Sequence, residues 1–149
     1  RVDFAALQKG DRCVEIVSFE AKHFKNPELR AKGVADPKVF RQIETYSGLL
    51  RERHDDVVAS YRRVCCNLLN LRGLDERHPQ RHKLLEGIVD GSTPLKVNTE
   101  PRLVVFGFDA DRRDGKVWKK HRDKLRDGLG KERVLFKGKP KKFTRGIST

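Results

Sequence analysis

Two acidic residues and a lysine near the start of the chain could carry out chemistry together. Asp3 lies in the first apolar segment, and Glu20 and Lys22 lie in the second, VEIVSFEAKH. Two carboxylates that reach toward each other can share a hard cation such as Mg²⁺, which prefers one or two carboxylates together with water and substrate phosphate. A lysine beside that cation can orient an attacking water or help to deprotonate it.

These three residues require a hairpin to bring them together. Residues 2–7 and 13–23 are predicted strands, because they are rich in Val, Ile, Phe and Leu. Gly10-Asp11 is the predicted two-residue loop between them, with glycine at the first central position.

This loop sets the expected register of the hairpin. Paired positions then sum to 21, so Asp3 lies opposite Ser18. Successive side chains of a strand point to opposite faces, which places Ser18, Glu20 and Lys22 on one face and Asp3 diagonal to Glu20. Diagonal neighbours are roughly 7–8 Å apart. The alternative interpretation is an exposed sheet face that carries ordinary surface charges, but the apolar neighbours of Glu20 and Lys22 argue against it.

The order of these residues resembles the PD-(D/E)XK nuclease superfamily. The signature of that superfamily is an acid on one strand of a hairpin and E-x-K on the next, here Asp3 and then Glu20-Ala21-Lys22. Gln42-Ile43-Glu44-Thr45-Tyr46 is similar to the Q-x-x-x-Y motif of RecB-type members, in the helix that follows the E-x-K strand.

The resemblance implies a fold, an activity and roles for particular residues. It implies a restriction-endonuclease-like core in which Asp3 and Glu20 bind Mg²⁺ or Mn²⁺, Lys22 acts on the water or on developing charge, and Gln42 and Tyr46 support the site. A helix and a first strand usually precede the strand with the acid, and neither is present here. The chain begins with Arg1 and has no methionine. We therefore expect further sequence upstream, and an upstream domain or a second copy of the chain could supply the missing elements.

Positive charge is concentrated at the end of the chain. The net charge is +13, and residues 112–149 contribute +11 of it. A one-sided basic surface attracts polyanions through counterion release. Nucleic acid is the predicted partner, with DNA favoured over RNA, and the predicted contacts are Lys116, Lys119, Lys120, Lys139, Lys141 and Lys142.

Composition excludes several other classes. No apolar run approaches the roughly 18 residues of a membrane span, so no membrane association is expected. Three cysteines, Cys13 and the adjacent Cys65 and Cys66, form neither a disulfide framework nor a CxxC zinc pair, which favours a reducing, cytoplasmic setting.

The remaining segments complete an α/β pattern. Helices are predicted from Asp36-Pro37 to about residue 52, from Asp55 to near Gly73, briefly at 83–89, and at 115–129. Strands are predicted at 102–108, as a run buried on both faces, and at 132–137. We expect an α/β domain at 1–137 with a mixed sheet flanked by helices, followed by a basic tail at 138–149.

The predicted function is metal-dependent hydrolysis of phosphodiester bonds in DNA. Two other functions stay open at this point. The chain could be a nucleic-acid-binding domain that has lost activity on the same scaffold, or a protein-interaction domain of a larger assembly whose basic face binds an acidic partner.

Overall fold

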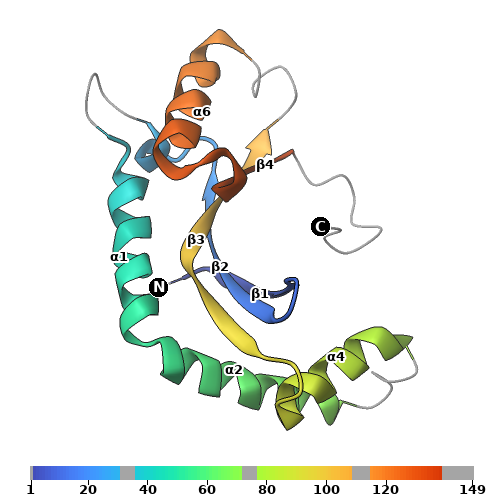
Figure 1. Ribbon diagram of the computed structural model, residues 1–149. Coiled ribbons are helices and arrows are strands. Elements are labelled where there is room, and N and C mark those ends of the chain that lie inside the picture. Colours follow the sequence, from blue (N-terminus) through green and yellow to red (C-terminus); the bar gives the residue numbers. More distant parts are fainter. Residues whose placement is uncertain (1, 31–35, 72–76, 109–114, 139–149) are drawn as a thin grey trace. The chain divides into compact units, whose positions relative to one another are not determined.

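The computed structural model describes the chain except for residues 1, 31–35, 72–76, 109–114 and 139–149. The elements follow the predicted order (Figure 1). They are β1 (Phe4–Lys9), β2 (Val14–His23), the 3₁₀ turn η1 (Pro27–Leu29), α1 (Lys38–Glu52), α2 (His54–Leu69), α4 (Pro79–Asp90), β3 (Leu95–Phe108), α6 (Lys116–Leu129), the 3₁₀ turn η2 (Lys131–Arg133) and β4 (Val134–Gly138).

The four strands form one mixed sheet in the order β1-β2-β3-β4. β1 and β2 are adjacent strands joined by a short turn, and are therefore an antiparallel hairpin. β3 and β4 pair in parallel, with Leu103 opposite Val134 and Val105 opposite Phe136. The fold class is confirmed at this level: an α/β chain with a mixed sheet flanked by helices.

The chain divides into two compact units. The first unit is Arg1–Ser18 with Thr45–Pro101, and the second is Phe19–Glu44 with Arg102–Thr149. Each unit contains its own hydrophobic core.

The core of the first unit joins the hairpin to α2, α4 and the start of β3. Val14 and Ile16 pack with Cys65, Ile88 and Leu95. Helices α2 and α4 lie side by side within this unit (Figure 1).

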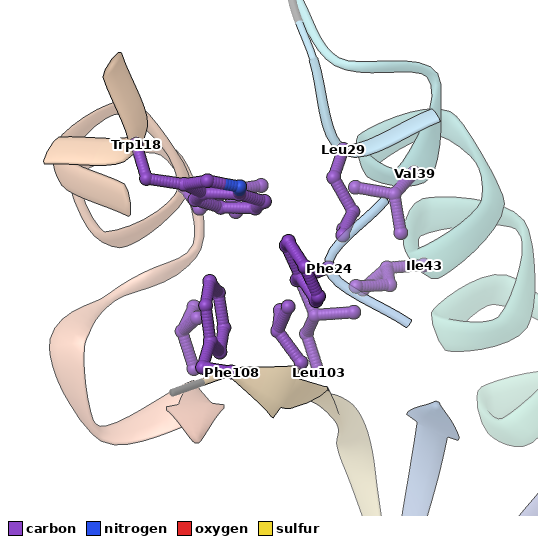
Figure 2. Packing of buried hydrophobic residues seen from close by; sticks show 10 residues of the cluster. Phe24, Leu29, Val39, Ile43, Leu103, Phe108 and Trp118 are labelled. Carbon is purple, nitrogen blue, oxygen red and sulfur yellow. The ribbon is translucent and has the colours of Figure 1, made fainter. Parts of the chain in front are cut away.

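The core of the second unit joins the segment after β2 and the start of α1 to β3, α6 and β4. Figure 2 shows Phe24, Ile43 and Leu103 with Phe108 and Trp118 in this cluster. The Phe108 and Trp118 rings meet edge to face at 4.9 Å between centroids, a favoured aromatic geometry.

The hairpin turn differs from the prediction. The amide of Gly10 donates to the carbonyl of Cys13 at 2.9 Å, so the two loop residues are Asp11 and Arg12. Glycine was expected at the first loop position because a type II′ turn needs a positive φ there. Gly10 does not have one, since the only described glycines with positive φ are Gly91, Gly107 and Gly130.

Two other elements are longer than predicted. α4 begins at Pro79 rather than at residue 83, with the proline in its first turn. β3 begins at Leu95 rather than residue 102. Its end is also not buried on both faces, because Leu103 and Val105 are buried while Phe106 is 39% exposed.

Candidate active site

Glu20 is a buried carboxylate in a strand of otherwise apolar character. Only 2% of it is exposed. Its Oε1 accepts a hydrogen bond from Nε2 of Gln42 at 2.8 Å. The same oxygen forms an ion pair with Nζ of Lys22, also at 2.8 Å. Its Oε2 is buried and has no hydrogen-bond partner among the residues that the structure describes. A buried carboxylate oxygen without a partner is costly in protein interiors, and such an atom calls for an explanation.

Lys22 lies two positions along β2, on the same face as Glu20. Its ammonium forms a second ion pair, with Oε2 of Glu28 at 2.7 Å. Burial lowers the pKa of Lys22, but the hydrogen bonds and charges of Glu20 and Glu28 outweigh burial and raise that pKa above its ordinary value. Lys22 is therefore an ammonium at neutral pH.

Gln42 reaches the strand from α1. Val39 and Ile43 are 0% and 2% exposed, and they anchor this end of the helix in the core of the second unit. Gln42 lies one turn after Val39 on the helix, three residues on, and therefore on a similar face. The sequence separates Gln42 from Glu20 by 22 residues, so the contact is made by the packing of the helix on the strand.

Of the five predicted site residues, the structure brings Glu20, Lys22 and Gln42 together within one unit. Asp3 and Tyr46 belong to the first unit. Asp3 is exposed, directly before β1, and Tyr46 is a buried residue of α1 that is 9% exposed.

Glu28 is a site residue that the sequence did not reveal. It lies in η1, the 3₁₀ turn after β2, and no spacing rule connects it to Glu20 or Lys22. The nearest signal in the sequence is Asn26-Pro27, a typical start of a helical turn, which fixes the backbone just before Glu28.

The predicted nucleic-acid contacts lie partly within the described chain. Lys116, Lys119 and Lys120 are exposed on α6. The opposite face of α6 carries Trp118 and Leu125, which are 6% and 0% exposed and belong to the core. Lys139, Lys141 and Lys142, with the rest of the predicted tail after Gly138, lie outside the described residues.

The first unit has an open cavity of about 560 Å³ between the hairpin turn and α4. Its lining includes Arg12, Cys13, Lys83 and Thr93, and none of the predicted site residues. Within the described ranges, no group of three or more His, Cys, Asp or Glu side chains is arranged to hold a metal. No described helix has the length and apolar character needed to cross a membrane.

No protein family, curated protein or solved structure matches this chain.

Proposed function

We propose that this chain is a metal-dependent phosphodiesterase that acts on DNA. The observation that carries the proposal is the state of Glu20. Its carboxylate is buried and fixed at Oε1 by Gln42 and Lys22, while Oε2 has no partner in the described part of the chain. A metal ligand requires such an oxygen, held in place and not already engaged.

The charge around Glu20 also suits a divalent cation. Glu20, Lys22 and Glu28 together carry one net negative charge, and the first two of these side chains are largely buried. Mg²⁺ or Mn²⁺ needs few protein ligands, because it keeps several waters and takes substrate phosphate oxygens. When bound, such an ion lowers the pKa of water and offsets the charge that develops on the phosphoryl oxygens.

Asp3 is the second ligand in this proposal. Paired positions sum to 23 when counted from the Gly10–Cys13 hydrogen bond, rather than the predicted 21. Asp3 is included because of its place in the sequence, as the acid that precedes Glu20-Ala21-Lys22 in the nuclease-like signature.

Lys22 would act as a cation rather than as a base. Its raised pKa keeps the proton on the ammonium, so Lys22 can donate hydrogen bonds to a water or to a phosphoryl oxygen. Gln42 would keep the carboxylate of Glu20 in one orientation, and Tyr46 would support the same helix.

The surface of α6 would hold the substrate. Lys116, Lys119 and Lys120 are spaced to lie on one exposed face, where they can contact phosphates without reading sequence. The hairpin followed by a helix that contacts its second strand is in keeping with a restriction-endonuclease-like core. The free thiols of Cys13, Cys65 and Cys66 support a reducing compartment such as the cytoplasm.

The deciding experiment measures DNA cleavage by the intact protein with Mg²⁺ or Mn²⁺, with and without a chelator. We expect metal-dependent cleavage that falls on the order of a hundredfold or more in Glu20→Gln and in Lys22→Gln, with DNA affinity nearly unchanged. Glu44→Gln is the matched control, because Glu44 is an exposed residue of α1.

Two outcomes would replace the proposal. Salt-sensitive DNA binding without cleavage under any metal would assign the chain to the non-catalytic binding domains. Absence of both binding and cleavage would leave a protein-interaction domain as the better account.

A further inference from the structure

The ammonium of Lys22 lies between two carboxylates from different elements. Oε1 of Glu20, in β2, is 2.8 Å away, and Oε2 of Glu28, in η1, is 2.7 Å away. The two acids differ in their surroundings, because the side chain of Glu20 is 2% exposed and that of Glu28 is 41% exposed. Glu20, one partner of Lys22, is thus the proposed metal ligand, whereas Glu28, the other partner, is not proposed to bind the metal.

Glu28 lies in a connecting segment, but its backbone is fixed by several contacts. Its amide donates to Oδ1 of Asn26 at 2.8 Å, which caps η1. Pro27 before it has a fixed φ, and Leu29 after it is fully buried in the core of the second unit. The carboxylate of Glu28 therefore starts from a fixed point beside Lys22.

A cation at Glu20 would compete with the ammonium of Lys22. Two positive charges at one carboxylate repel each other, and in a largely buried place that repulsion is screened weakly. Without a second acceptor, the ammonium of Lys22 would either keep its ion pair with Glu20 and repel the metal, or move away from the site.

We propose that Glu28 is the positioning residue of Lys22: it accepts the ammonium when Glu20 binds the divalent ion, so metal and lysine can occupy the site together. This inference rests on the proposed function. Glu28 acts through Lys22 and is not itself a ligand of the metal.

A double-mutant cycle in Mg²⁺ affinity tests this role. Calorimetric titration of the intact protein with Mg²⁺ alone is carried out on the parent, Glu28→Gln, Lys22→Met and the double variant. We expect Glu28→Gln to weaken Mg²⁺ binding about tenfold, as is typical of residues that orient a metal site from outside. In the Lys22→Met background, where no ammonium competes, the same change should alter affinity by less than about twofold.

Three further measurements complete the test. Glu44→Gln removes the same charge from an exposed position on α1 and should leave Mg²⁺ affinity unchanged. Asn26→Ala removes the cap that holds Glu28 and should weaken Mg²⁺ binding in the same direction, but less. With DNA present, Glu28→Gln should lower kcat while KM for DNA stays the same.

The outcomes separate this inference from the proposed function. If Glu28→Gln weakens Mg²⁺ binding equally with and without Lys22, Glu28 binds the metal directly. If the parent binds Mg²⁺ and Glu28→Gln binds it equally well, Glu28 has no role in the site. Either result overturns this inference and leaves the proposed function standing. A parent that does not bind Mg²⁺ at all would overturn both the inference and the metal site.

Discussion

Nε2 of Gln42, on helix α1, donates a hydrogen bond to Oε1 of Glu20, on strand β2, at 2.8 Å. Only the amide nitrogen of Gln42 can donate to an ionised carboxylate, so the orientation of this side chain is determined by its partner. The bond ties the carboxylate to a helix whose start is anchored by the fully buried Val39. Hydrogen bonds to a charged group are worth more than neutral ones, about 1.5–3 kcal/mol.

Gln42 should therefore affect catalysis through the orientation of Glu20. We expect Gln42→Ala to lower the rate of metal-dependent DNA cleavage about tenfold or more, the range for groups that orient a ligand. Gln42→Glu should lower it further, because it places a second negative charge against Glu20. Single-turnover cleavage measures the effect, and Gln80→Ala, at an exposed position of α4, is the control. A Gln42→Glu variant as active as the parent would contradict this role.

The sequence predicts correctly which side chains of β2 share a face of the sheet, although it places the two-residue loop of the hairpin incorrectly. A slip of one residue on one strand would move every side chain to the other face. Here the loop moved by one residue along both strands, so the pair sum changed from 21 to 23 and stayed odd. Glu20 and Lys22 are two positions apart on β2 and therefore share a face in any register, and their ion pair agrees with this.

Strand and helix periodicity cannot predict the contacts of residues that lie in connecting segments. Glu28 reaches Lys22 only because η1 turns the chain back beside β2, and no periodicity in the sequence records that turn. The strand was predicted only from residue 102, where the apolar run RLVVFGF begins, and the more polar residues before it carry no such signal. The structure accommodates Pro101 as a buried residue within β3.

Gly107 predicts a specific loss of stability. Its φ is +91°, and an added Cβ would lie 2.5 Å from Cδ2 and Nε2 of His23. The pairing of β3 with β4 shifts register between Phe106 and Phe108, as at a β-bulge. We expect Gly107→Ala to lower the free energy of unfolding by about 1–3 kcal/mol, measured by urea titration.

The variant His23→Ala separates the two causes of that loss. Combined with Gly107→Ala, it removes the clash but not the backbone strain, so it should restore only part of the stability. Full restoration would show that the φ of Gly107 imposes no cost, and no restoration would show that the ring of His23 does not oppose the Cβ.

His121, on α6, predicts a dependence of stability on acid. Burial, and then the positive charge of Arg30, lower the pKa of its imidazole. The unfolded chain therefore binds the proton more readily than the folded chain. The stability contributed by neutral His121 is complete above the pKa of the unfolded chain, about 6.5, and is lost as the pH falls through the lower pKa of the folded chain.

This pH dependence is measured by thermal unfolding between about pH 5 and pH 8. We expect His121→Gln to flatten the acid limb of the curve, and Arg30→Gln to flatten it less, because only the smaller cause is removed. His78→Gln, an exposed histidine in the other unit, is the control and should leave the curve unchanged. An acid limb of the same steepness in His121→Gln would refute the assignment.

The basic face of α6 predicts how DNA binding depends on salt. Each phosphate neutralised by a lysine adds about −0.9 to the slope of log K against log salt for duplex DNA. If Lys116, Lys119 and Lys120 each contact one phosphate, their joint substitution by glutamine should make the slope shallower by nearly 3. The matched control replaces Lys9, Lys83 and Lys96, three exposed lysines of the first unit, and removes the same total charge. Fluorescence anisotropy of a labelled duplex at several salt concentrations gives both slopes. Equal changes in the two triple variants would mean that DNA responds to net charge alone, and that α6 is not its binding surface.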